Sequence, residues 1–276
     1  MPILRLGCVT SVIEKVSNAV GVLYEPRRIK KKAEPEAQKI KELASIELTE
    51  IQQRAIDRMV QQEGRKQENI EAITAQAAAS LDETADVQNL EEDWVAHFFK
   101  NCDIVSDKEM QSLWSKLLSG ESFKPGTFSK RTVDFVASMD KKDAEIFTKF
   151  CQFSWFEEDW IPLIMEPTDE IYTSSEINFS VLKPLDSIGL ISFEATAGYR
   201  RMRFGKNATF SYFGRPTIIE FKKDKDNELN LGKVLLTRTG EELAPICGAQ
   251  RNEKFYEYII DKWFKAGLVL HSPLLT

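Results

Sequence analysis

The sequence between Glu91 and Glu121 reads EEDWVAHFFKNCDIVSDKEMQSLWSKLLSGE and predicts two consecutive helices. Its three leading carboxylates complement the dipole at a helix start, and apolar residues follow them at helical spacing. Ser106 and Glu109 then have the S-x-x-E spacing of a capping box, and Gly120 is typical of a helix end. We predict a compact helical core built around Trp94, Phe98, Leu113, Trp114 and Leu117.

A long and strongly charged segment precedes this core. Residues 36–63 are rich in Ala, Glu, Gln and Lys without a proline, which predicts one long helix. Gly64 predicts a break or hinge, and residues 65–80 predict a second helix. Because its apolar stripe is narrow, the first helix needs a partner, either a hairpin mate within the chain or another subunit. The residues predicted to face that partner are Ile40, Leu48, Ile51, Ala55 and Met59.

The N-terminal segment combines an apolar helix face with a basic run. Val9, Val12, Val16 and Val20 fall at helical spacing, which predicts an amphipathic helix ahead of Pro26. Two interpretations remain open: attachment to an anionic lipid surface, or a solvated linker that follows a helix packed on the body. The candidate lipid-binding cations are Arg27, Arg28, Lys30, Lys31 and Lys32.

The C-terminal part predicts a mixture of helices and strands. A short helix over 177–188 is followed by strands within 199–221, an order typical of a winged-helix-like α+β module. Cations alternate with aromatic residues in the first strand, as in a wing that contacts phosphates, but the preceding helix offers only Lys183 to a DNA groove. The alternative is a strand with an exposed cationic face. The candidate nucleic-acid-binding residues are Arg200, Arg201, Arg203 and Lys206.

Length and composition indicate the number of domains and the class of protein. The 276 residues fit one large or two ordinary domains, and 42% hydrophobic with 29% charged residues is typical of a globular protein. We predict an α+β fold that is predominantly α. The predicted segments are an amphipathic helix and basic linker at 1–35, a long helical arm at 36–89, a helical core at 90–170, and a winged-helix-like α+β module at 171–276.

The sequence lacks the motifs of known catalytic and metal sites. It contains no HExxH, GxxxxGK[ST], GxGxxG or GxSxG motif, and neither His97 nor His271 has partners at zinc-ligand spacing. The acidic EEDW clusters at 91–94 and 157–160 are interpreted as helix caps rather than Mg²⁺ ligands. We therefore expect no catalytic residue, no metal site, no cofactor and no enzymatic activity.

Charge and cysteine spacing bear on the compartment. The four cysteines lie far apart, which indicates reduced thiols, and no apolar run approaches the ~20 residues that span a bilayer. The net charge of −6 argues against indiscriminate binding of nucleic acid. We expect a cytoplasmic protein, with peripheral attachment to the inner membrane as the alternative.

Several of these stretches resemble a known family. The core segment at 91–121, its continuation PGTFSKRTVDFVASMDKKDAEIF at 125–147 and the stretch LLTRTGEELAPI at 235–246 resemble a bacterial family called domain of unknown function 2806. The helix MQSLWSKLL at 110–118 is more distantly similar to the abortive-infection alpha family of phage-resistance proteins. The resemblance implies a bacterial protein from a prophage or defence locus, and it supplies no catalytic residues.

The leading function hypothesis is a non-enzymatic, self-associating interaction protein, acting as an effector or adaptor in bacterial phage defence. Its expected partner is a second copy of the chain or another protein. The alternatives are nucleic-acid binding through the winged-helix-like module and a peripheral membrane-attached effector.

Overall fold

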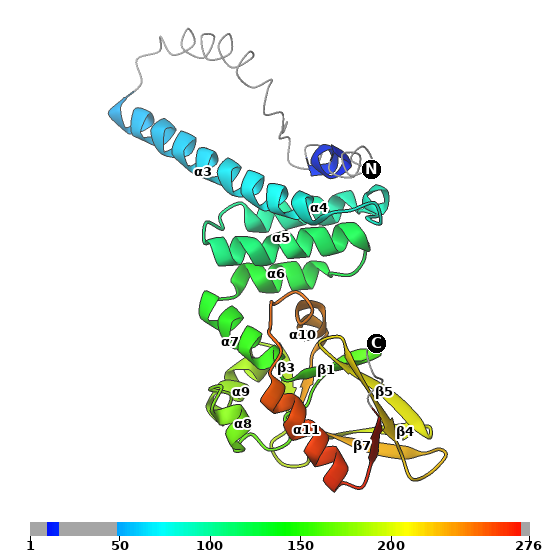
Figure 1. Ribbon diagram of the computed structural model, residues 1–276. Helices are drawn as coiled ribbons and strands as arrows, with labels where there is room; N and C mark the ends of the chain where they lie inside the picture. The colour runs from blue at the N-terminus through cyan, green and yellow to red at the C-terminus, as the bar shows by residue number, and fades with distance from the viewer. Residues whose placement is uncertain (1–9, 17–48, 272–276) are drawn as a thin grey trace. The chain divides into compact units, whose positions relative to one another are not determined.

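A computed structural model describes residues 10–16 and 49–271 (Figure 1). The chain divides into two compact units, Met1–Ala137 and Ser138–Thr276. This division differs from the boundary predicted between residues 170 and 171. The reason is aromatic packing: the Phe153 ring lies 5.1 Å from the Tyr172 ring and 4.9 Å from the Phe255 ring, so residues near 150 belong with the C-terminal core.

The first unit is helical throughout its described part. A short helix covers residues 10–16, and the others follow after a gap in the described chain. These are α3 (Glu50–Ser80), the 3-10 helix η1 (Val87–Asn89), α4 (Glu92–Cys102), α5 (Lys108–Phe123) and α6 (Lys130–Ser138), whose last residue belongs to the second unit.

Helix α3 is continuous, and the predicted break at Gly64 is wrong. It begins after Thr49, whose side chain accepts a hydrogen bond from the backbone N–H of Gln52 while the Gln52 side chain accepts one from the Thr49 N–H. Good helix formers surround Gly64, so the cost of one glycine is too small to interrupt the helix. The predicted residues 36–48 lie outside the described part of the chain.

The core of the first unit forms where α4 and α5 meet. The Trp94 and Phe98 rings stack at 5.2 Å, and Phe98 meets Trp114 edge to face at 5.1 Å. Trp94, Phe98, Trp114 and Leu117 are buried, whereas Leu113 is half-buried. Leu113 precedes Trp114 by one residue, about 100° around the helix, so it lies at the edge of the core-facing stripe.

The start of α5 differs from the predicted capping box. Asp107, not Ser106, is the N-cap residue, and its carboxylate accepts from the N–H groups of Glu109 and Met110 at 3.0 and 3.1 Å. The side chain of an aspartate satisfies the first free amides of a helix as well as serine does, and its charge complements the helix dipole.

The second unit mixes helices with short antiparallel strands, so the chain is an α+β protein. Its helices are α7 (Lys141–Cys151), α8 (Glu170–Thr173), α9 (Phe179–Ser187), α10 (Arg238–Leu243) and α11 (Glu253–Lys265). Its strands are β1 (Ser154–Glu157), β2 (Asp159–Pro162), β3 (Ile191–Phe193), β4 (Tyr199–Phe204), β5 (Asn207–Tyr212), β6 (Arg215–Glu220), β7 (Asn227–Gly232), β8 (Val234–Leu236) and β9 (Val269–His271).

Five of these strands form one antiparallel sheet in the order β2-β1-β5-β6-β9, and two further pairs are β3–β8 and β4–β7. The second EEDW cluster lies at the β1–β2 turn, so its interpretation as a helix cap is wrong. Glu157 ends β1, Glu158 has a positive φ of 55°, and Asp159 begins β2. Such a tight reversal joins neighbouring antiparallel strands.

An aromatic cluster fills the space between this sheet and α11. The Trp155 ring of β1 stacks on Tyr256 at 5.4 Å and meets Trp263 at 4.9 Å, both of them from α11. On β5, Phe210 and Tyr212 face the same cluster, because alternate residues of a strand share one face. These buried rings fix the positions of β1 and β5 relative to each other.

Candidate functional site

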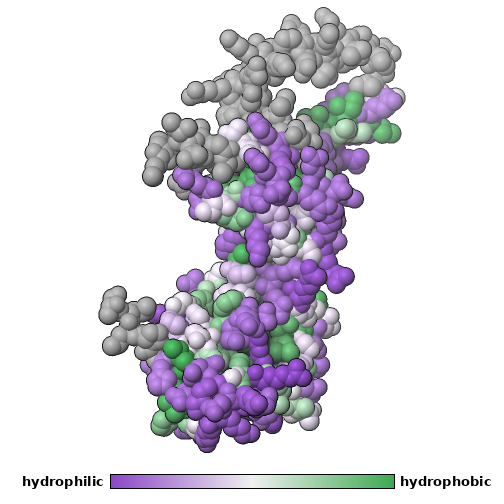
Figure 2. Space-filling model, turned by 90° about the vertical axis from the view of Figure 1, so that its right-hand side faces the viewer, coloured by the Kyte–Doolittle hydropathy of each residue, from purple (hydrophilic) through white to green (hydrophobic). Residues whose placement is uncertain are grey.

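The first half of α3 is an exposed helical surface. Every residue from Thr49 to Arg65 is exposed, whereas the second half of the helix carries buried residues from Asn69 onward. The exposed half includes large apolar side chains, which is unusual for a helix surface that stays in water. Their exposed fractions are 71% for Ile51, 43% for Ile56, 65% for Met59 and 65% for Val60. At the topmost coloured end of the space-filling view, where α3 begins, hydrophobic residues lie among hydrophilic ones (Figure 2).

The predicted interface residues can now be placed in part. Ile51, Ala55 and Met59 are exposed and share one side of α3, as their i, i+4 spacing requires. Ile40 and Leu48 lie outside the described residues. Ile56 and Val60 widen the apolar surface, although the predicted stripe omits them.

Charges along the exposed half are balanced. Arg54 pairs with Glu50 at 3.4 Å, and Gln53 donates a hydrogen bond to Asp57 at 3.0 Å. Exposed pairs of this kind contribute little to helix stability. They leave the surface with both signs of charge close to its apolar residues.

The second half of α3 is anchored on α5 by buried polar contacts. Asn69 donates to the carbonyl of Asp103 at 2.8 Å, and its own amide oxygen accepts from Gln111 Nε2 at 3.0 Å. Gln111 also donates to the Val105 carbonyl at 2.8 Å. Buried amides that are hydrogen-bonded in this way fix the register of the two helices, because any shift would leave a polar group without a partner.

The predicted nucleic-acid patch on β4 is largely neutralised by carboxylates. Arg201 forms ion pairs of 2.6 Å with both Glu157 and Glu158. Burial raises the pKa of Glu157, and the nearby Arg201 guanidinium opposes that rise. The remaining contacts of the patch are Arg200 with Glu228 at 3.2 Å and Lys206 with Glu220 at 3.5 Å.

Arg203 completes the predicted set. It is exposed, has a positive φ of 68° and lies where the β4–β7 register shifts between Met202 and Phe204. One exposed cation beside three paired ones offers few contacts to a phosphate backbone, whose binding needs several unpaired cations.

The N-terminal helix is packed rather than free in its described part. Val12 and Val16 are buried, and Lys15 Nζ donates to the carbonyls of Gln88 and Leu90 at 2.7 and 2.8 Å. This apolar face is therefore already covered by protein. The cations of the basic run, Arg27, Arg28, Lys30, Lys31 and Lys32, lie outside the described residues.

Histidines and acids do not converge on a metal site within residues 10–16 and 49–271, where no group of three potential ligands occurs. His97 Nε2 lies 2.7 Å from Asp134 Oδ1, and His271 Nε2 lies 3.2 Å from Glu220 Oε2. Each is a surface pair between neighbouring elements. In the same described part, every helix is too short or too polar to cross a lipid bilayer.

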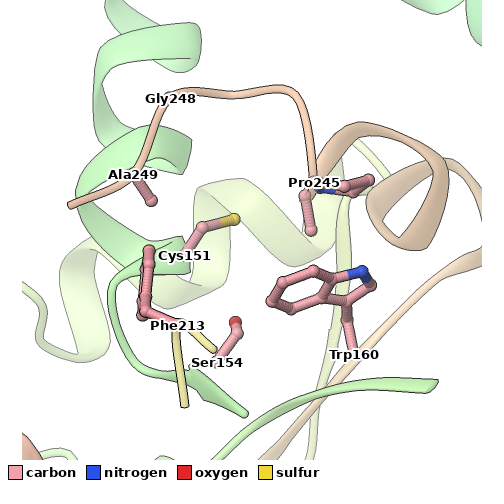
Figure 3. A pocket seen from close by; sticks show the side chains of 8 residues that line it. Cys151, Ser154, Trp160, Phe213, Pro245, Gly248 and Ala249 are labelled. Atoms are coloured by element: carbon pink, nitrogen blue, oxygen red, sulfur yellow. The ribbon is translucent and has the colours of Figure 1, made fainter. Parts of the chain in front are cut away.

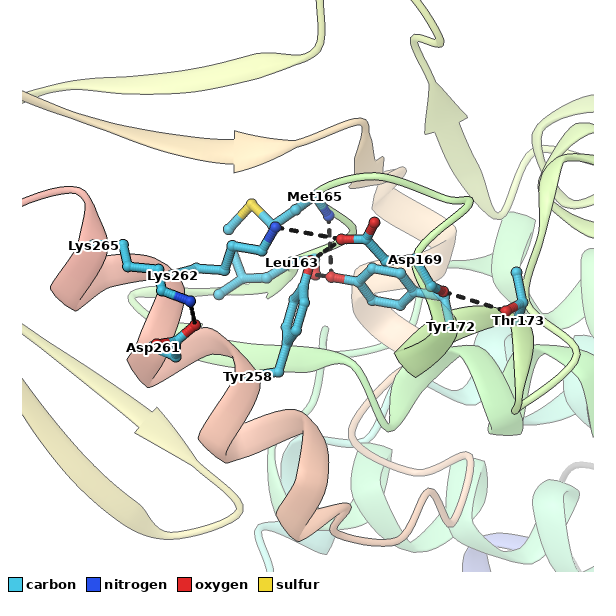
Figure 4. Close-up of polar contacts among 9 residues, drawn as sticks. All are labelled: Leu163, Met165, Asp169, Tyr172, Thr173, Tyr258, Asp261, Lys262 and Lys265. Carbon is cyan, nitrogen blue, oxygen red and sulfur yellow. Dashed lines mark hydrogen bonds and ion pairs between the residues drawn. The ribbon is translucent and has the colours of Figure 1, made fainter.

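A cluster of phenols and one carboxylate fastens α11 to the segment around α8 (Figure 4). Tyr258 donates to Asp169 Oδ2 at 2.6 Å, and Lys262 approaches the same oxygen at 3.3 Å. Tyr172 donates to the Leu163 carbonyl at 2.7 Å. Burial raises the pKa of both tyrosines, so their hydroxyls stay protonated and act as donors. These contacts are structural, since each donor already has its acceptor.

The second unit also contains a pocket (Figure 3). It has a volume of about 230 Å³ and collects side chains from the end of α7, from β1 and β2, from the β5–β6 turn and from the chain after α10. The lining residues are Cys151, Ser154, Trp160, Phe213, Ala244, Pro245, Gly248 and Ala249. None of these residues is predicted to form a site from the sequence, because they come from segments far apart in the chain.

Comparison with known proteins places the chain in a family. The family model described as "Protein of unknown function (DUF2806)" matches residues 53–260. The chain belongs to this family. The match agrees with the resemblance carried by the core segment, and it does not extend to the abortive-infection alpha family. No curated protein and no solved structure matches the chain. Membership in DUF2806 assigns no activity, so the function has to be argued from the surfaces described above.

Proposed function

We propose that this member of DUF2806 is a non-enzymatic interaction protein that self-associates through the exposed half of α3. The observation that carries the proposal is the exposure of Ile51, Ile56, Met59 and Val60 on a helix that is otherwise firmly anchored. A short exposed helix is marginal in water by itself, and contiguous apolar residues on it favour burial against a partner. A second copy of the same helix is the occupant to which we commit.

Ile51, Ala55 and Met59 lie within about 80° of one another around α3, whereas Arg54 and Asp57 lie on the opposite side of the helix. The contact that we propose between two copies is therefore apolar, with these charged side chains left in solvent. The seam from residue 50 to residue 65 is about 24 Å long, and we expect association that depends on concentration in the micromolar range.

Sedimentation velocity of the full chain between about 1 and 200 µM tests self-association. We expect Ile51→Gln with Met59→Gln to raise the dissociation constant by at least about tenfold, since both apolar contacts are lost without a change in charge. Ile104→Gln is the matched control, because Ile104 is 73% exposed in the same unit but lies outside α3. A monomeric parent at 200 µM, or a double variant that associates like the parent, would contradict the proposal.

Two charge variants test which side of α3 forms the contact. Ala55→Asp places a carboxylate within the apolar face and should weaken association, whereas Arg54→Asp, on the opposite side of the helix, should leave it nearly unchanged. Equal weakening by the two variants would contradict the assignment of the contact to this face. Participation in phage defence, as effector or adaptor, and a cytoplasmic location are the biological setting that we propose for such an assembly.

Nucleic-acid binding is the second candidate. Two short helices, α8 and α9, precede β3, and this order supports a winged-helix-like interpretation of the second unit. The pairing of β3 with β8 counts against it, because these strands are not consecutive and do not form a hairpin. The ion pairs of Arg200, Arg201 and Lys206 count against it. Titration with a DNA duplex at about 50 mM salt separates the candidates: we expect no binding, and salt-dependent binding that Arg203→Gln weakens would favour the alternative.

A further inference from the structure

The pocket in the second unit contains a buried hydroxyl without a hydrogen-bond partner. Ser154 is fully buried, and within the described part of the chain its Oγ meets neither a donor nor an acceptor. Buried polar groups are nearly always hydrogen-bonded, so an unpartnered hydroxyl that faces a cavity indicates a missing polar atom there. In Figure 3 the Ser154 oxygen points into the space between Phe213 and Trp160.

A strained residue forms one wall of the pocket. Phe213 and Gly214 connect β5 to β6 as a two-residue turn, with φ angles of 46° and 80°. Positive φ at both positions is the requirement of a type I′ turn, where Asn-Gly is the favoured pair. A bulky aromatic residue rarely adopts this conformation, and residues held in this way cluster at functional sites. The turn itself gives no reason for a phenylalanine; its ring meets Tyr212 edge to face at 4.9 Å and lines the pocket.

The lining carries no charged side chain. Cys151 provides the other polar atom, and burial together with the neighbouring Cys247 raises the pKa of its thiol well above the ordinary value. The thiol is therefore neutral at physiological pH. A charged ligand would lose its hydration without finding a counter-ion, so the pocket suits a neutral molecule.

The segment after α10, which forms the roof of the pocket with Pro245, Gly248 and Ala249, is held in place by hydrogen bonds. The segment after α10 is tied to α7 by Thr148, whose hydroxyl donates to the Cys247 carbonyl at 3.0 Å. The Cys247 thiol donates to the Ala244 carbonyl at 3.1 Å. A fixed roof keeps the cavity open without a ligand, as expected of a preformed site.

We propose that this pocket binds a small, neutral aromatic molecule of about the size of indole. Its ring lies between Trp160 and Phe213, and its polar group forms a hydrogen bond with the hydroxyl of Ser154. The size follows from the volume of about 230 Å³, since a cavity of about 150 Å³ already accommodates benzene. Aromatic walls favour a flat ring, which stacks or meets them edge on.

Paired probes test the proposal on the full-length chain. Indole and indene have nearly the same shape, but only indole carries an N–H that Ser154 Oγ can accept. Titration calorimetry, together with the NMR signal of the Trp160 side-chain N–H, measures the binding of each probe. We expect indole to bind with a dissociation constant below about 1 mM and indene to bind roughly 2- to 10-fold more weakly, as loss of one hydrogen bond implies.

Three variants locate the binding. Ser154→Ala should remove the preference for indole over indene, and Ala249→Leu, which fills the cavity, should weaken both probes. Phe213→Asn should weaken both as well, while thermal unfolding shifts upward or stays unchanged, because Asn-Gly suits the turn. The proposal is overturned if neither probe binds below about 1 mM, if Ser154→Ala keeps the preference, or if Ala249→Leu binds indole like the parent. A lower melting temperature for Phe213→Asn would assign Phe213 to the core and overturn its role as a ligand-holding wall.

Discussion

The two halves of α3 have similar apolar residues and opposite surroundings. Ile51 and Ile56 lie in the exposed half, whereas Ile70 and Ile73 lie in the half that packs on α5. Hydrophobicity alone therefore does not decide which residues are buried. The polar anchor between Asn69 and Gln111 marks the point where burial begins. Toward the start of the helix Lys66 still approaches Asp103 at 3.7 Å, and every residue from Thr49 to Arg65 is exposed.

This difference has a physical cause and a functional consequence. Most helix stability comes from packing, so the anchored half nucleates the helix and the exposed half extends from it at about one hydrogen bond per residue. The exposed half is therefore already helical before a partner binds. A partner that binds it would have less conformational entropy to overcome than one that had to fold the segment first.

The largest expected effect comes from matched isoleucines in the two halves. Ile73→Ala should lower the free energy of unfolding by about 2–5 kcal/mol, because Ile73 is fully buried and its removal leaves a cavity. Ile56→Ala should change it by less than about 0.5 kcal/mol, since exposed substitutions matter little. Urea unfolding of the dilute full chain, followed by circular dichroism, measures both. Equal losses would mean that the exposed half is packed in solution even at low concentration.

A smaller effect is expected at the polar anchor. Asn69→Ala should cost about 1–3 kcal/mol, because it leaves the Asp103 carbonyl and one Gln111 contact without a partner in a buried place. Gln62→Ala, at an exposed position of the same helix, is the control and should stay within about 0.5 kcal/mol. If Asn69→Ala unfolds at the parent's urea midpoint, the anchor does not set the boundary between the two halves.

Local patterns predicted much of the helical unit. Helical spacing places Trp94, Phe98 and Trp114 on α4 and α5, where the structure buries them. The pattern fails where one residue decides the outcome: Leu113 is apolar like Trp114, but helix geometry turns it to the edge of the core. The helix break predicted at Gly64 is wrong for a related reason, because the helix formers on both sides outweigh the effect of one glycine.

The pocket could not be predicted from local patterns at all. Cys151, Ser154, Phe213 and Ala249 come from distant parts of the sequence, and the first three are brought together by the pairing of β1 with β5 and by the hydrogen bond from Tyr212 to the Gln152 carbonyl. Strands β1 and β2 were not predicted either, because their four-residue segments contain an acidic cluster that is equally typical of a helix start. Phe213-Gly214 was the one available signal, an aromatic residue at a hairpin turn.

The smallest expected effect sharpens the boundary between the two halves of α3. A Cβ added at Gly64 meets no atom within 4 Å, so Gly64→Ala should stabilise the helix by roughly 0.5–1 kcal/mol through propensity alone. Because the exposed half can open separately from the anchored half, hydrogen exchange of the amides at residues 60–68 measures the effect better than global unfolding does. Gly120→Ala is the matched control in α5, where the new Cβ would lie 2.7 Å from Phe128 Cε2 and should destabilise the unit. Slower exchange in Gly64→Ala is expected if one continuous helix carries both halves. Faster exchange would indicate a hinge at Gly64, as the sequence predicts, and would mean that the exposed half is not a rigid extension of the anchored half.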